Sequence, residues 1–211
     1  YFEQALFAFY RNNIIPAVRN IGGLGIISDK GILNLSIVMN KPKDNFSINE
    51  GYELMTSFIK AIFPEGADKI EAVEIANSYC PGDYDLSIDG KKFAGIAQRK
   101  IKEAVVVSIY ISIFGDQQKR ANIMKDFYEI GIDDQEVRYK YPKVDPECME
   151  TLENLLNKKF TLEDVFERVE KVLYGLDCDL EKGEYTEAMV EEYNAIFEQA
   201  KERNESYLEG K

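Results

Sequence analysis

Hydrophobic and polar residues follow two different periods along the chain. Up to residue 114, helical spacing alternates with short, densely apolar or period-2 segments, whereas from Asp116 onward the spacing is mainly helical. Helices are predicted at 2–13 and 49–63, the second capped by Asn49, with further helix starts at Pro146 and Thr161 and a stop at Gly175.

Seven segments in the first part have the composition of strands. They are 14–18, 25–28, 32–39, 70–75, 86–88, 92–97 and 104–114. The turn Asp29-Lys30-Gly31 predicts a hairpin between the second and third of these. Asp89-Gly90 predicts another between the fifth and sixth, because both positions tolerate positive φ. The β-branched run of the seventh predicts a central, buried strand.

Hairpins followed by helices indicate an α+β domain with a mixed or antiparallel sheet rather than a doubly wound one. The 211 residues suffice for one substantial domain, which we place at residues 1–175. Residues 176–211 have few large apolar side chains and many glutamates. We expect an acidic extension there, either a solvated helix around 185–200 or a tail.

The net charge of −12 is concentrated in the last third of the chain. Residues 145–211 hold 19 acidic and 8 basic side chains, whereas residues 1–144 hold 19 and 18. This balance argues against nucleic-acid binding. A basic strip could still steer an acidic partner protein. It consists of Lys91, Lys92, Arg99, Lys100 and Lys102.

Two further features of the composition bear on location. No apolar run approaches the ~20 residues that span a bilayer, so we expect no membrane association. The three cysteines have no CxxC spacing, which fits a reducing, cytoplasmic setting.

The chain contains no histidine. This excludes Ser-His-Asp triads, Cys-His dyads and histidine-based zinc sites, and we predict no metal site. A nucleophile in this chain must therefore be activated by a group other than imidazole.

Cys80 is the candidate nucleophile. A lone cysteine often serves as a small buried apolar residue, but Cys80 stands on a Cys-Pro-Gly turn, whereas packing cysteines more often lie inside strands or helices. We interpret Cys148, in the first turn of a helix, and Cys178, in the acidic tail, as structural or incidental.

Lys92 is the candidate activating group. If Phe93 faces the core, alternation turns Lys92 and Ala94 towards the cysteine loop. There an ammonium would favour the thiolate and stabilise a developing oxyanion. The alternative is a solvated hairpin lysine. Gly95 and the small residues beside it leave room for a slim apolar substrate. A cysteine paired with a lysine points to acyl transfer through a thioester.

The segment Arg19-Asn20-Ile21-Gly22-Gly23-Leu24-Gly25 matches neither GxGxxG nor a P-loop. It fits either a simple turn between strands or a loop whose backbone lies close to a substrate.

Three segments together resemble a known superfamily: 18–36, 78–100 and 105–113. They are similar to the biotin/lipoate protein ligases and lipoyl-octanoyl transferases. The nearest branch is the amidotransferases, which move an octanoyl group from the glycine cleavage H protein to lipoyl domains of 2-oxoacid dehydrogenases. The resemblance runs from Tyr1 to about Leu173. It implies further strands before the first helix, so we expect an N-terminal portion to be missing from this sequence.

The resemblance also implies roles for individual residues. Cys80 would be the nucleophile and Lys92 the lysine that holds the acyl carbonyl. Arg19, Gly22 and Gly23 would form the substrate loop. The polar residues of the following hairpin, Asp29 and Asn34, would belong to the same substrate-binding set. Gly95 joins this set for a different reason, because its small size leaves room for the substrate.

Two departures separate this chain from ATP-dependent lipoate ligases. Leu24 and Ser28 stand where those ligases have a glycine and a histidine, which favours transfer without a cofactor. The alternatives left open are a lipoate-protein ligase, which would need ATP and Mg²⁺, and a non-catalytic acyl-binding scaffold.

Overall fold

A computed structural model describes residues 1–19, 21–40, 42, 46–132 and 141–208. Its centre is a five-stranded sheet in the order β1-β5-β4-β3-β2, with every neighbouring pair antiparallel. The strands are β1 (Ile32–Asn40), β2 (Glu71–Ala72), β3 (Asp85–Ile88), β4 (Lys91–Ile101) and β5 (Ala104–Ser112). The predicted α+β class is confirmed.

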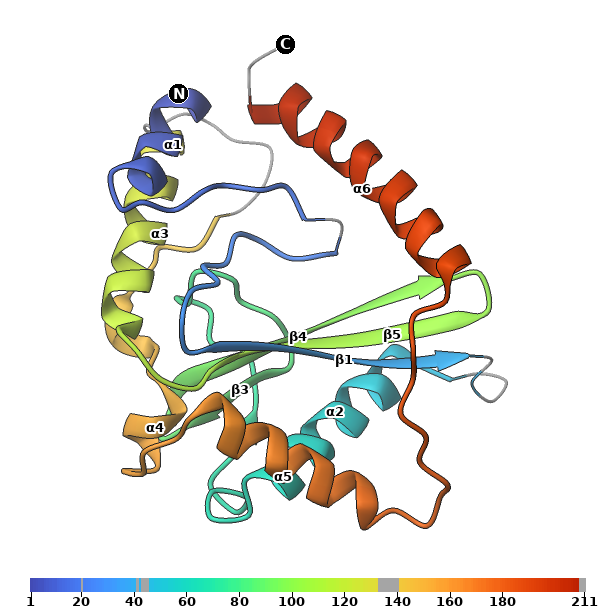
Figure 1. Ribbon diagram of the computed structural model, residues 1–211. Coiled ribbons are helices and arrows are strands. Elements are labelled where there is room, and N and C mark those ends of the chain that lie inside the picture. The colour runs from blue at the N-terminus through green and yellow to red at the C-terminus, as the bar shows by residue number, and fades with distance from the viewer. Residues whose placement is uncertain (20, 41, 43–45, 133–140, 209–211) are drawn as a thin grey trace.

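Helices cover the sheet unevenly (Figure 1). They are α1 (Phe2–Tyr10), α2 (Ile48–Ile62), α3 (Gln117–Ile132), α4 (Leu152–Leu155), α5 (Leu162–Tyr174) and α6 (Glu187–Leu208), and η1 (Pro146–Cys148) is a 3₁₀ turn. Helices α2 and α5 pack on one face, while α1 and α3 lie side by side at one end of the sheet.

The main core lies between the sheet and the α2–α5 layer. Met55 and Ile59 of α2 are fully buried there, as are Leu86 of β3 and Val107 of β5. Their spacing on α2 is four residues, so one face of the helix meets the sheet. A second cluster joins α1 to α3 at the end where the cysteine loop lies.

Several sequence predictions are confirmed by this arrangement. The β3–β4 hairpin turns at Asp89 and Gly90, with φ of 51° and 73°. Strand β5 lies inside the sheet between β1 and β4. Thr161 caps α5 in a capping box, and Gly175 ends that helix.

The predicted hairpin between 25–28 and 32–39 is wrong. Residues 25–28 form no strand, and β1 pairs instead with β5, for example Ile37 with Val107. The backbone of the earlier segment has other partners: Gly25 donates its N–H to the Tyr128 hydroxyl.

The predicted strand at 14–18 is also absent. Every second residue from Ile14 is half-buried, as in a strand, but the segment pairs with no strand. Ile14 packs instead on the cluster between α1 and α3. Pro16 has no N–H to donate to a ladder. Val18 bonds instead to α6, donating to Asn204 and accepting from Arg203.

Three element boundaries also differ from prediction. Helix α2 is capped by Ser47, not Asn49, through a capping box with Glu50. The strand predicted at 70–75 shortens to Glu71–Ala72, since the Ile75 N–H bonds to the Asp85 carboxylate rather than to a strand. The helix predicted at Pro146 is one 3₁₀ turn.

A β-bulge corrects the prediction that Lys92 and Ala94 share a face. Lys92 pairs with Ser87 and Ala94 with Leu86, which leaves Phe93 unpaired. Phe93 and Ala94 both enter the core, while Lys92 and Gly95 face the cysteine loop.

The acidic extension contains α6, so its predicted helix is confirmed. This helix stands away from the sheet on the side opposite α2 and α5 (Figure 1), and none of its described residues is buried. Among the described residues, no helix is both long and apolar enough to cross a membrane.

Candidate active site

A cavity of about 300 Å³ opens between the glycine loop, the cysteine loop and strand β4. Six of the eight predicted site residues line it: Arg19, Gly22, Gly23, Cys80, Lys92 and Gly95. The rest of the wall includes apolar and polar groups from α2, β4 and β5, among them Tyr52, Ile96, Ala97, Gln98 and Tyr110.

Cys80 is half-buried on the cavity wall. Its Sγ accepts a hydrogen bond from the Leu24 N–H at 3.2 Å and lies 3.8 Å from Nη2 of Arg19. A Cβ on Gly23, whose φ is +98°, would lie 3.2 Å from Sγ and 2.7 Å from Nη2. Only glycine therefore lets this loop close over the sulfur.

Lys92 is 3% exposed, so the solvated alternative is wrong. Its ammonium has three partners, which match its three N–H donors: the Asp85 carboxylate at 2.7 Å, the Ser78 hydroxyl at 3.1 Å and the Cys80 carbonyl oxygen at 2.5 Å. Lys92 thus holds the backbone of Cys80 rather than its sulfur.

Asp85 completes this pair from the first position of β3. Burial raises the pKa of its carboxyl, an effect opposed by the Lys92 ammonium and by N–H donors from Ile75 and Gly82. The carboxylate thus ties together β3, β4 and the ends of the cysteine loop.

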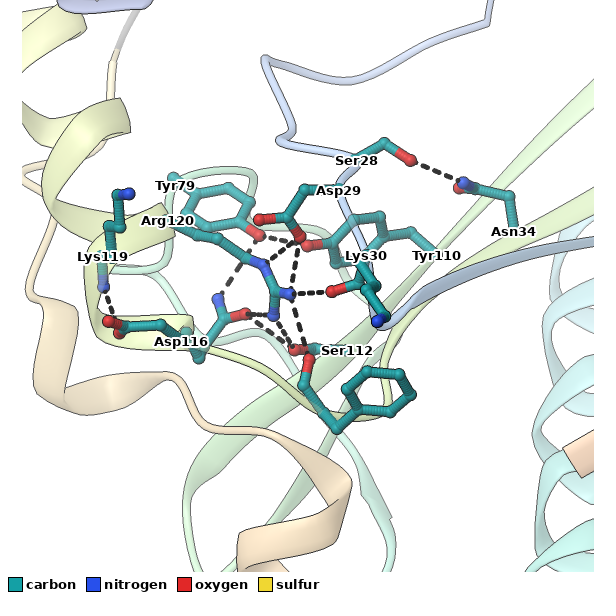
Figure 2. Close-up of polar contacts among 12 residues, drawn as sticks. Ser28, Asp29, Lys30, Asn34, Tyr79, Tyr110, Ser112, Asp116, Lys119 and Arg120 are labelled. Atoms are coloured by element: carbon teal, nitrogen blue, oxygen red, sulfur yellow. Dashed lines mark hydrogen bonds and ion pairs between the residues drawn. The ribbon is translucent and has the colours of Figure 1, made fainter. Parts of the chain in front are cut away.

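Asp29 and Asn34, predicted to bind substrate, are not among the residues that line the cavity. Asn34 donates to Ser28, and Asp29 pairs with Arg120 of α3 at 2.6 Å (Figure 2). Arg120 is 1% exposed and also bonds to the carbonyls of Lys30 and Phe114.

The Arg120 cluster continues through polar contacts to Tyr79 and Tyr110 (Figure 2), and both tyrosines line the cavity. Arg120 donates to Gln117, and Gln117 donates to the Tyr79 hydroxyl at 3.4 Å. Tyr79 and Tyr110 share a hydroxyl–hydroxyl bond of 2.7 Å. Burial raises the pKa of both tyrosines, so they stay neutral and can donate. Asp29 therefore supports the residue next to Cys80 from a distance.

Sequence reasoning missed Asp85 and Tyr128. The sequence did carry a signal for Asp85. A buried lysine needs a counter-ion, and the predicted hairpin places Asp85 opposite Gly95, next to Lys92. Tyr128 carried no signal, since nothing in its helix relates it to residues about 50 and 100 positions earlier.

The other two cysteines differ from Cys80. Cys148 is half-buried in η1, where burial and the nearby Asp145 raise its pKa to about 11. Cys178 is exposed beyond α5. Among the described residues, no three cysteine or acidic side chains cluster closely enough to hold a metal ion.

Residues 3–174 match the family model of the lipoyl protein ligase A/B catalytic domain. The chain belongs to this family. The family match covers the whole sheet and α1 to α5, and α6 lies beyond it. The resemblance to lipoyl and octanoyl protein transferases is therefore confirmed.

Curated relatives within the family are acyltransferases. An octanoyl-[GcvH]:protein N-octanoyltransferase of Lysinibacillus sphaericus is 41% identical over 209 residues, which cover 99% of this chain and 75% of that protein. A lipoyl-[GcvH]:protein N-lipoyltransferase of Listeria monocytogenes is 40% identical over 191 residues, covering 90% and 69%.

A solved structure shares the fold of this lipoyl ligase-like domain. It is a protein of T. acidophilum with bound lipoic acid, aligned with a TM-score of 0.70 at 16% identity over 94% of this chain and 75% of that one. At this identity the comparison supports the fold alone.

Proposed function

We propose that the protein transfers an octanoyl or lipoyl group from a lysine of the glycine cleavage H protein to a lysine of a lipoyl domain. The observation that carries this proposal is the position of Cys80, whose sulfur lies on the cavity wall with a hydrogen-bond donor and a cation beside it. Relatives about 40% identical carry the corresponding octanoyl and lipoyl transferase names.

The reaction proceeds in two balanced steps. The Cys80 thiolate attacks the carbonyl carbon of the donor amide, so a C–S bond forms, the C–N bond breaks and the departing lysine amine takes up a proton. The amine of the acceptor lysine then attacks the thioester, the C–S bond breaks and that amine gives up a proton. One amide replaces another, so no nucleotide is needed to drive the exchange.

The cavity suits a thioester intermediate. Its volume of about 300 Å³ lies at the lower end of the range of small-molecule sites. Ile96, Ala97 and Gly95 supply apolar or small surface next to Lys92. In this proposal Lys92 exchanges its bond to Ser78 for one to the acyl carbonyl oxygen as negative charge develops there.

The test follows an acyl group between two proteins. Full-length enzyme is mixed with octanoylated H protein and an apo lipoyl domain, without nucleotide, and intact-mass spectrometry follows the octanoyl mass. We expect it to move to the lipoyl domain, with an octanoyl adduct on Cys80 when the acceptor is left out.

Variants sharpen the result. Cys80→Ala should abolish transfer, whereas Cys148→Ala, which removes a half-buried thiol beside the site, should preserve it. If the octanoyl mass stays on the donor until ATP, Mg²⁺ and free octanoate are added, the protein is a ligase. If the lipoyl domain binds but is acylated in neither reaction, the protein is a scaffold.

A further inference from the structure

We infer that the glycine loop, through the guanidinium of Arg19 and the N–H of Leu24, holds the Cys80 sulfur as a thiolate. Arg19 is then a catalytic residue, because it contacts the reacting atom. Lys92 has the separate task of fixing the cysteine backbone and the acyl carbonyl. The inference rests on the proposed function for its purpose, although its test needs no acyl substrate.

The contacts of the sulfur carry this assignment. Leu24 donates its N–H to Sγ at 3.2 Å, and Arg19 Nη2 lies 3.8 Å from Sγ. The same Nη2 donates to the Leu24 carbonyl at 2.6 Å, which keeps the guanidinium over the loop. A cation and a backbone donor facing one sulfur favour its charged form.

Lys92 is poorly placed for this task. Its three N–H donors contact the Asp85 carboxylate, the Ser78 hydroxyl and the Cys80 carbonyl oxygen, and its positive charge is balanced by the carboxylate 2.7 Å away. Its charge and its donors are thus used on groups other than the sulfur.

The remaining titratable groups around the sulfur come from four elements and one loop. They are Tyr52 of α2, Asp83 of the cysteine loop, Asp85 of β3, Tyr110 of β5 and Tyr128 of α3, with Tyr79 beside Cys80 itself. The carboxylates oppose a thiolate. The tyrosines are neutral at pH 7, and burial raises their pKa values further above the ordinary value of 10. Arg19 therefore supplies the cation that a thiolate requires.

Tyr128 keeps the two loops at this distance. Its hydroxyl donates to the Tyr79 carbonyl at 2.9 Å and accepts from the Gly25 N–H at 3.1 Å. One buried hydroxyl thus joins the residue before Cys80 to the residue after Leu24. We assign Tyr128 as a positioning residue.

Alkylation by iodoacetamide tests the inference on the full-length protein. Digestion with trypsin gives peptide 70–91, which contains Cys80 alone, while peptides 144–158 and 172–182 report Cys148 and Cys178 in the same sample. For Arg19→Gln, we expect Cys80 alkylation to fall at least ~fivefold at pH 7 but less than ~twofold at pH 9.5, where a thiolate forms without help. Tyr128→Phe should show a smaller drop of the same kind.

Two variants make the result decisive. Arg19→Lys keeps the charge and should restore about half of the pH 7 rate. Arg11→Gln removes an exposed arginine that pairs with Asp126, and should leave Cys80 unchanged. A wild-type rate in Arg19→Gln at pH 7, or an equal fall at both pH values, would overturn the assignment. If transfer fails while this pattern holds, only the proposed function is wrong.

Discussion

Lys92 and Asp85 form an ion pair whose side chains are only 3% and 2% exposed. Burying two charges costs several kcal/mol each, which their attraction offsets only when the remaining donors and acceptors are satisfied. Here all three ammonium donors have partners, and the carboxylate accepts two further backbone N–H bonds. The pair therefore fixes the cysteine loop. Removing either side chain would leave the other charge buried without a partner, so the stability of the fold depends on both.

Replacing Asp85 with Asn should show how strongly the stability of the fold depends on the pair. The variant leaves a buried ammonium without a counter-ion, so the free energy of unfolding should fall by about 3–5 kcal/mol. Urea denaturation followed by circular dichroism measures the change. Asp83→Asn, a matched change on the exposed part of the same loop, should cost less than about 0.5 kcal/mol.

A double variant separates loss of the charge from loss of the contact. Asp85→Leu combined with Lys92→Met should be more stable than Asp85→Asn alone, because neither charge remains buried. Equal or lower stability of the double variant would show that the pair stabilises the fold through its geometry.

At the level of elements, Glu65 joins the end of α2 to the α5 layer. It follows α2 and pairs with Arg168 at 3.0 Å and Lys158 at 2.7 Å. Burial acts to raise its pKa, but hydrogen bonds from Arg168 and Lys158 outweigh it and lower the pKa to about 2. Because the folded pKa lies below the ordinary value of 4.5, the carboxylate stabilises the fold above pH 4.5, and this stabilisation is lost as the pH falls towards 2.

Glu65→Gln should therefore destabilise the protein by about 1–2 kcal/mol at pH 7, after allowance for the partial exposure of the group. The difference from wild type should shrink steadily between pH 4.5 and 2.5 in urea titrations. Glu167→Gln, on the exposed face of α5, serves as control and should show no such dependence. A difference that is independent of pH would contradict the ion-pair explanation.

The turn before β1 depends on Gly31. Its φ is +101°, and a Cβ there would lie 2.3 Å from the backbone oxygen of Phe114. Gly31→Ala should thus lower the free energy of unfolding by at least ~3 kcal/mol. Gly90→Ala is a matched control, because its φ is +73° but no atom lies within 4 Å of the added methyl group. It should cost about 1 kcal/mol.

The sequence predicted the elements that depend on local signals and failed where backbone partners lie far along the chain. The β3–β4 turn follows from Asp89-Gly90, and the end of α5 from Gly175. The pairing of β1 with β5, and of Val18 with α6, has no local signature. The bulge at Phe93 explains why simple alternation placed Lys92 correctly and Ala94 wrongly.

At the scale of the whole molecule, α6 contacts the chain at Val18, just before the glycine loop. None of the described residues of α6 is buried. Even so, Asn204 accepts a hydrogen bond from the N–H of Val18, and Arg203 donates one to its carbonyl oxygen. Val18 is the residue before Arg19. The division of the chain into a domain at 1–175 and an extension stays a prediction. The effect of α6 on the glycine loop can be measured by removing the helix.

Removing residues 183–211 should change the free energy of unfolding by less than about 1.5 kcal/mol, since little apolar surface is lost. The rate of octanoyl transfer should fall at least ~threefold, because the loop that carries Arg19 loses an anchor. Asn204→Ala removes one of the two Val18 bonds without removing the helix and should reproduce part of the loss. Full activity in both variants would show that α6 does not position the loop.

The pairing of β1 with β5 also affects how the chain acquires its site. The β3–β4–β5 meander closes through short turns, whereas Ile37 and Val107 are 70 positions apart when they pair. The entropy of loop closure rises with the length of chain enclosed, so the meander should form first and β1 should dock last. During synthesis, β1 must wait without its partner until residue 112 has left the ribosome. We therefore expect Cys80 to reach its place before the glycine loop, which precedes β1, closes against its sulfur.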